Sequence, residues 1–168
     1  MANPTLFVRV MGMPRSGNHP IIKLIEQNAG PRGWVHYNYC RPGQDPLTAA
    51  SVETPDGMWK IGVAENQPHI DAIKPLEDHD VVVFSYEGLN LEAHHSLDSG
   101  ISMQFEDRID CNLFITRSPQ NWVASWMQQR LRKLDKTPDA VFNLEKNPLF
   151  VTAACMTKFV HWAAHLRA

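Results

Sequence analysis

The sequence predicts an α/β fold in which parallel strands are covered by helices on both faces. Residues 5–11 are rich in β-branched and apolar side chains and lead into Gly12, as a buried strand does before a tight loop. Apolar side chains then recur at helical spacing over residues 20–26. Two later, largely apolar runs, residues 81–86 and 111–116, are typical of parallel strands buried on both sides. This order of strands and helix indicates an α/β domain.

The remaining segments carry weaker signals. Residues 34–57 contain three prolines and two glycines without a sustained period, which predicts a long loop rather than part of the core. A short strand is expected over residues 59–63 and a short helix over residues 67–74. Ser118 is a suitable N-cap for a further helix, and a last, deeply buried helix is expected over roughly residues 148–166.

Length and charge limit the functional classes. The 168 residues suit a single domain, residues 1–168, and 43% apolar with 20% charged residues argues against intrinsic disorder and coiled coils. A net charge of −2 provides no overall basic field, so neither nucleic acid nor a membrane is expected as a partner. The chain starts without a secretory signal pattern, and no apolar run approaches the ~18 residues of a membrane span, which predicts a cytoplasmic protein.

The sequence predicts no metal site. The chain has three cysteines, Cys40, Cys111 and Cys155. An odd number without a Cys-x-x-Cys pair argues against disulfides or a thiolate zinc site and favours buried, reduced thiols. His161 and His165 are four residues apart, but Trp162 stands where a His-Glu-x-x-His zinc motif has its glutamate.

The loop after the first expected strand has the frame of a phosphate-binding loop. Gly12 and Gly17 are separated by Met13-Pro14-Arg15-Ser16, between a strand and a helix. A nucleoside triphosphatase would continue with Lys and then Ser or Thr, whereas this chain has Asn18 and His19, so ATP with Mg²⁺ fits poorly. The residues instead suit a metal-free anion cradle containing a guanidinium and a hydroxyl. An ordinary turn with a solvated Arg15 is the alternative.

A second pair of polar residues follows the expected strand at residues 111–116. Arg117 ends this strand, and Ser125 lies eight positions later in the expected helix, so both groups could hold one phosphate. The combination of Gly-x-Pro-Arg-Ser-Gly with the later run Phe-Ile-Thr-Arg-Ser-Pro-Gln-Asn-Trp-Val-Ala-Ser-Trp resembles the sulfotransferases that use 3′-phosphoadenosine 5′-phosphosulfate (PAPS). The resemblance spans residues 6–126.

The resemblance implies a P-loop NTPase-like, three-layer α/β/α fold and a PAPS site. It assigns the 5′-phosphosulfate to the first loop, comprising Pro14, Arg15, Ser16, Gly17, Asn18 and His19. It assigns the 3′-phosphate to Arg117 and Ser125. Family members commonly have Thr-Thr or Thr-Trp after the loop glycine, and a basic, glycine-containing loop beyond this region; Asn18-His19 replaces the former, and the latter does not occur before Ala168.

Sulfuryl transfer requires a base for the acceptor and a cation for the leaving phosphate oxygen. Arg15 suits the cation role. Glu87 follows an expected parallel strand, which would deliver it to the ligand-binding edge of the sheet as the base, with His94 or His95 as reserves. The alternative for Glu87 is a solvated loop carboxylate, and the two histidines are more often plain loop residues.

The sequence therefore predicts a metal-independent sulfotransferase that acts on a hydroxyl or amine of a small-molecule or glycan acceptor. Two other functions stay open: a nucleotide kinase of the P-loop class, and a non-catalytic nucleotide-binding or interaction module of sulfotransferase ancestry. Trp122 and Trp126 are expected to be core anchors, with adenine stacking as the alternative role.

Overall fold

The computed structural model describes residues 4–12, 17–41, 44–87, 106–118, 121–122 and 124–125. The chain divides into two compact units, residues 1–116 and 117–168, and each is considered by itself. The prediction of one sulfotransferase-like domain over residues 1–168 stays a prediction. In the described part of the chain, no helix combines the length and apolar character needed to cross a membrane.

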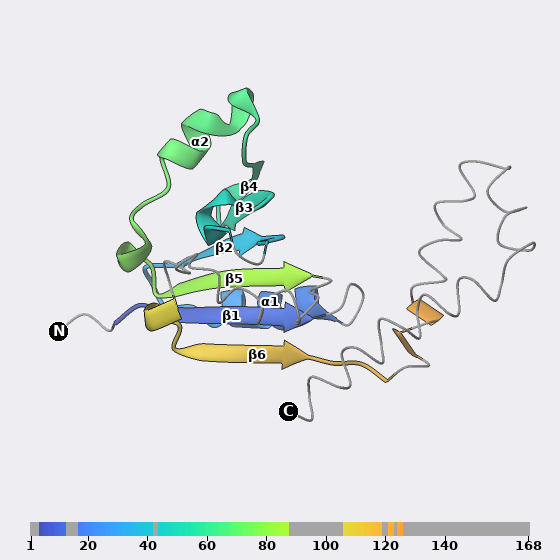
Figure 1. The fold of residues 1–168 in the computed structure, drawn as a ribbon. Coiled ribbons are helices and arrows are strands. Elements are labelled where there is room, and N and C mark those ends of the chain that lie inside the picture. The colour runs from blue at the N-terminus through green and yellow to red at the C-terminus, as the bar shows by residue number, and fades with distance from the viewer. Residues whose placement is uncertain are drawn as a thin grey trace, which may run out of the picture. The chain divides into compact units, whose positions relative to one another are not determined.

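The first unit contains a six-stranded sheet (Figure 1). Its strands are β1 (Leu6–Gly12), β2 (Trp34–Asn38), β3 (Ser51–Thr54), β4 (Gly57–Lys60), β5 (Val81–Glu87) and β6 (Cys111–Ile115), and its α-helices are α1 (Asn18–Gln27) and α2 (Gln67–Asp71). The strand order is β4-β3-β2-β5-β1-β6. Strands β2, β5, β1 and β6 run parallel to one another, whereas β3 is antiparallel to both of its neighbours, β2 and β4. The α/β prediction is confirmed, and the sheet is mixed.

The expectation of a long loop over residues 34–57 was wrong. Strand β2 pairs with β5 inside the sheet, and Val35 and His36 are both buried because their side chains point to opposite, covered faces. Pro46 and Pro55 lie in the connections on either side of β3, and Gly57 is the first residue of β4; Pro42 and Gly43 lie outside the described residues. Pro46 starts a short 3₁₀ turn (Pro46–Thr48) that Asp45 caps by accepting a hydrogen bond from the Leu47 amide at 2.9 Å. The strand expected over residues 59–63 is observed as β4, which starts two residues earlier and ends three residues earlier.

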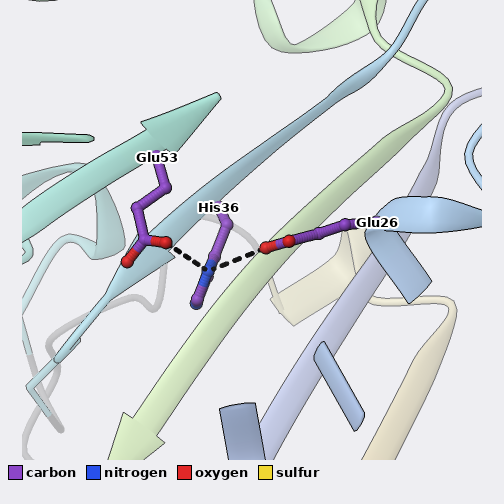
Figure 2. A group of neighbouring side chains, drawn as sticks. All are labelled: Glu26, His36 and Glu53. Carbon is purple, nitrogen blue, oxygen red and sulfur yellow. Dashed lines mark ion pairs between the residues drawn. The ribbon is translucent and has the colours of Figure 1, made fainter. Parts of the chain in front are cut away.

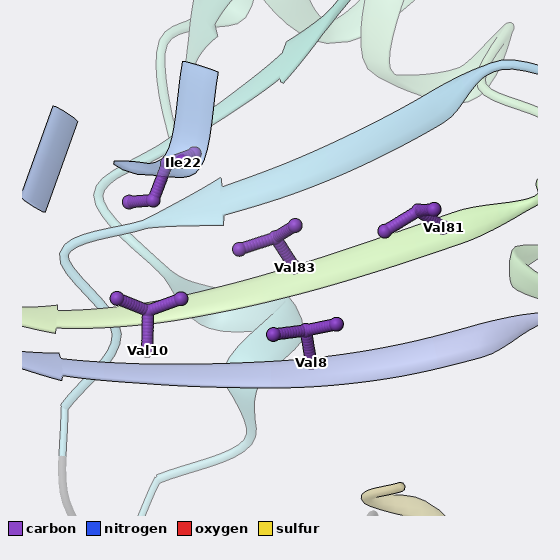
Figure 3. Close-up of a cluster of buried hydrophobic side chains, with 5 residues drawn as sticks. All are labelled: Val8, Val10, Ile22, Val81 and Val83. Carbon is purple, nitrogen blue, oxygen red and sulfur yellow. The ribbon is translucent and has the colours of Figure 1, made fainter. Parts of the chain in front are cut away.

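The core beneath α1 is built from β-branched side chains of two adjacent strands. Val8 and Val10 of β1, Val81 and Val83 of β5, and Ile22 of α1 form one buried cluster (Figure 3). Strand β5 is buried on both faces, as predicted. The same expectation was wrong for β6, in which partly buried and exposed residues alternate and Phe114 is 49% exposed.

The buried face of α1 is partly polar. Ile22 is buried, but Leu24 is 57% exposed, so the apolar stripe expected from the sequence does not coincide with the buried face. Asn18 and Glu26 are buried instead, one turn before and one turn after Ile22. The helix therefore presents a polar side chain to the sheet on each side of its central apolar contact.

Several further expectations concern single residues. Cys40 is buried and reduced, and burial raises the pKa of its thiol to about 12, whereas Cys111 is partly exposed. Cys155 lies outside the described residues. In the second unit, the Ser118 hydroxyl accepts a 3.4 Å hydrogen bond from the Asn121 amide, as expected of an N-cap. Trp122 is 1% exposed, which agrees with a core position.

Candidate functional site

Strands β1 and β5 are the two central strands of the parallel part of the sheet, and their carboxyl ends lie side by side. Gly12 is the register partner of Glu87. After β1 the chain passes through α1 to β2, on one side of β1, and after β5 it returns to β6 on the other side. Ligands of open α/β sheets bind where the strand order reverses in this way, at the carboxyl ends of the strands.

Helix α1 begins at this edge of the sheet. Gly17 is its N-cap and has φ 108° and ψ 24°, a left-handed conformation that glycine adopts without steric cost. Gly17 has no side chain that could cap the helix, and the first turn of α1 contains no acidic residue. Amide groups at the start of such a helix are suited to bind an anion.

Glu87 lies beside the start of this helix. Its Oε1 atom accepts a hydrogen bond of 3.4 Å from Nδ2 of Asn18 and lies 3.6 Å from Nε2 of His19. The Glu87 side chain is only 10% exposed, whereas that of His19 is 62% exposed. Glu87 is therefore a mostly buried carboxylate at the end of a strand, and the solvated-loop alternative was wrong. A carboxylate in this position can accept a proton from a group bound at the helix start.

The structure brings together four of the residues that the sequence singled out, namely Gly17, Asn18, His19 and Glu87. Arg117 and Ser125 belong to the second unit, where Arg117 is exposed and Ser125 is half-buried. The remaining predicted site residues lie outside the described residues: Pro14, Arg15, Ser16, His94 and His95. The same is true of Trp126, His161 and His165.

A second group of polar side chains lies on the face of the sheet that α1 covers, and it was not expected from the sequence. Figure 2 shows the ring of His36, on β2, between the carboxylates of Glu26 and Glu53. Glu26 belongs to α1 and Glu53 to β3. Nδ1 of His36 is 3.3 Å from Oε1 of Glu26 and 4.0 Å from Oε2 of Glu53. The three side chains line a pocket of about 320 Å³ that His19 and Lys23 also border.

The charge state of Glu26 follows from its neighbours. Burial alone would raise the pKa of this carboxyl group, but His36 and Lys23 together hold the pKa below its ordinary value. Lys23 Nζ lies 3.3 Å from Oε2 of Glu26, whereas His36 lies beside Oε1. Glu26 is therefore an ionised carboxylate inside the fold at neutral pH.

One signal in the sequence could have revealed this second group. Residues 35–38 alternate between apolar and polar side chains, which places His36 and Asn38 on one face of a strand. The density of prolines and glycines in the following residues favoured a loop and hid the alternation. Glu26 and Glu53 carry no local signal that distinguishes them from exposed acidic residues.

No protein-family model, curated protein or solved structure matches this chain.

Proposed function

We propose that this protein is a PAPS-dependent sulfotransferase with a P-loop NTPase-like, three-layer core. The observation that carries the proposal is the placement of Asn18 and His19, from the expected phosphate loop, beside the mostly buried Glu87. A reaction of this kind needs an anion site and a proton acceptor next to each other. The position of β1 inside the parallel strands, directly followed by α1, supports the same proposal.

In the proposed reaction, the acceptor is a hydroxyl or amine of a small molecule or glycan. The amides at the start of α1, together with Arg15 and Ser16, hold the 5′-phosphosulfate. The acceptor oxygen or nitrogen attacks the sulfur while its proton passes to Glu87. The bond from sulfur to the bridging oxygen breaks, and this oxygen leaves on 3′-phosphoadenosine 5′-phosphate, with its new charge stabilised by Arg15. His94 and His95 are the alternative proton acceptors, and no metal ion takes part.

Calorimetric titration of the full chain tests the nucleotide class. The proposal expects saturable binding of 3′-phosphoadenosine 5′-phosphate and much weaker binding of ATP with Mg²⁺. The opposite preference would favour a nucleotide kinase. Tight binding of the 3′-phosphorylated nucleotide without transfer from radiolabelled PAPS to any acceptor of a broad panel would favour a non-catalytic module.

Arg117→Ala is expected to weaken binding of 3′-phosphoadenosine 5′-phosphate by about 10- to 150-fold. This range corresponds to the roughly 1.5–3 kcal/mol that a charge-assisted hydrogen bond contributes. Binding of the nucleotide without a 3′-phosphate should change little, because the proposed partner of Arg117 is absent from it. The exposed Arg41→Ala serves as the matched control. Equal weakening of both nucleotides in Arg117→Ala would contradict a 3′-phosphate role.

Mg²⁺ is expected to leave the affinity for 3′-phosphoadenosine 5′-phosphate unchanged. The residues after Gly17 are Asn18 and His19, so the chain lacks the loop Lys and the hydroxyl that ligates Mg²⁺ in P-loop enzymes. Titrations with and without millimolar Mg²⁺ check this expectation. A strong dependence on Mg²⁺ would support the kinase alternative.

A further inference from the structure

The hydrogen bonds around His36 define which of its ring nitrogens carries a proton. Nδ2 of Asn38 donates to Oε1 of Glu53 at 3.0 Å, which turns the amide oxygen of Asn38 toward Ser85. The Ser85 hydroxyl donates its only proton to this oxygen, at 3.0 Å. Ser85 Oγ must therefore accept the 2.8 Å hydrogen bond that joins it to His36 Nε2. Nε2 therefore carries a proton, and Nδ1 carries a lone pair unless the ring is protonated on both nitrogens.

Nδ1 of His36 is directed into the group of carboxylates without a hydrogen bond. His36 is 1% exposed, and among the buried side-chain nitrogen and oxygen atoms of the described residues Nδ1 is the one without a hydrogen-bond partner. A lone pair and two carboxylates that converge on one point repel each other unless a cation lies between them. The arrangement calls for a positive charge at this point.

A metal ion suits this geometry better than a shared proton. Oε1 of Glu26 is only 3.3 Å from Nδ1 of His36, yet the two atoms do not form a hydrogen bond. The oxygen therefore lies away from the direction in which an N–H bond at Nδ1 would point. A metal ion bound to Nδ1 would lie in that direction, with its other ligands to the side. With metal–ligand bonds of about 2.0–2.2 Å, neighbouring ligand atoms of a tetrahedral site are about 3.3–3.6 Å apart. The 3.3 Å between Nδ1 and Glu26 falls in this range, whereas the 4.0 Å between Nδ1 and Glu53 has to shorten when the ion binds.

We propose that Glu26, His36 and Glu53 bind a divalent transition-metal ion of the zinc type. The ligands are Nδ1 of His36 and one oxygen of each carboxylate, atoms that all lie within 4.8 Å of one another. Two carboxylates balance the charge of the ion. The pocket of about 320 Å³ beside them has room for water or another small ligand in the fourth position.

The donor set and its surroundings select this class of metal. Imidazole nitrogen favours zinc and its neighbours in the periodic table, whereas Ca²⁺ and Mg²⁺ prefer sites made entirely of oxygen. Metal-bound histidines commonly donate their second ring N–H to a partner that orients the ring, which is the role of Ser85 here. Asn38 holds Glu53 in the same way, and Lys23 lies 3.3 Å from the other oxygen of Glu26.

This metal site goes beyond the proposed sulfuryl transfer, which requires no metal. Its ligands connect α1 to β2 and β3, whereas Glu87 contacts the opposite end of α1. A bound ion would stabilise the attachment of the helix to the sheet. The two proposals are separable, because metal binding is measured without any nucleotide or acceptor.

The test uses the full chain after removal of metal with a chelator. Co²⁺ is added as a spectroscopic probe, and Zn²⁺ affinity is measured by competition with a chromophoric chelator. We expect one Co²⁺ ion per chain, with the visible absorption bands of a cobalt ion of low coordination number. Zn²⁺ should displace this Co²⁺, whereas Mg²⁺ and Ca²⁺ should not. Zn²⁺ should also raise the melting temperature, because it binds the folded state.

Ligand variants make the test specific. Glu53→Gln and His36→Gln should weaken Zn²⁺ binding by more than about 100-fold, and Ser85→Ala, which removes the orienting partner, by about 10- to 100-fold. Glu53 is 26% exposed, so its variant is expected to fold even if His36→Gln does not. Glu65→Gln and His69→Gln, both at exposed positions, are matched controls that should bind as the wild type does. Absence of stoichiometric binding to the wild-type chain, or equal affinity in Glu53→Gln, would overturn the proposal.

Discussion

Glu87→Gln is expected to lower the rate of sulfuryl transfer by about 10²- to 10⁴-fold while leaving the affinity for 3′-phosphoadenosine 5′-phosphate nearly constant. The glutamine side chain has the same shape but no basicity. Its amide oxygen can still accept the hydrogen bond that Asn18 donates to Glu87 Oε1. The change therefore removes proton transfer and keeps the hydrogen bond with Asn18 at the start of α1.

The measurement combines single-turnover transfer from radiolabelled PAPS with nucleotide titration of the same preparations. Glu65→Gln, at an exposed position, is the matched control and should keep full activity. Normal turnover in Glu87→Gln together with loss of activity in His94→Ala or His95→Ala would assign the base to one of the histidines. Full activity in all three variants would exclude every proton acceptor named here.

The second large effect concerns the stability of the sheet. Phe84→Ala is expected to lower the free energy of unfolding by about 3–5 kcal/mol, because it removes a large side chain from a closely packed site. Phe84 is 1% exposed on β5, and its ring lies 5.7 Å from that of Tyr37 on β2, centroid to centroid. Small domains are stable by only about 5–15 kcal/mol, so the variant would lose a large part of its stability.

Urea denaturation followed by circular dichroism measures this loss. Phe114→Ala is the control, because it deletes the same side chain from β6 of the same sheet at a position that is 49% exposed. The control should lose much less stability, since its ring already contacts water. Similar losses in the two variants would mean that Phe84 is not packed as the structure shows.

Local patterns were sufficient to predict the strands and helix that surround the proposed nucleotide site. Continuous apolar runs predicted β1 and β5, whose ends carry Gly12 and Glu87. A helical period before Gly30 predicted α1. Because parallel strands end at the same edge of a sheet, these assignments also placed Glu87 near the loop. Each depends on residues that are close together in the chain.

The expectation for residues 34–57 failed because strand formation there depends on partners that are distant in sequence. Strand β2 pairs with β5, and its Trp34–Tyr37 stretch is matched with Val81–Phe84, more than forty residues later. Pro46 and Pro55 fall in the turns on either side of β3, where they are compatible with a sheet. A count of turn-forming residues could not distinguish turns within a sheet from a long loop.

The sequence by itself determined the α/β class and the residue types of the proposed phosphate loop, because both depend on local periodicity and spacing. Only the tertiary structure decided which polar side chains converge. Glu26, His36 and Glu53 come from a helix and two strands, and they meet because α1 packs Ile22 against the sheet and thereby carries Glu26 toward β2 and β3. Burial then makes their charges depend on one another, a property that none of the three residues has alone.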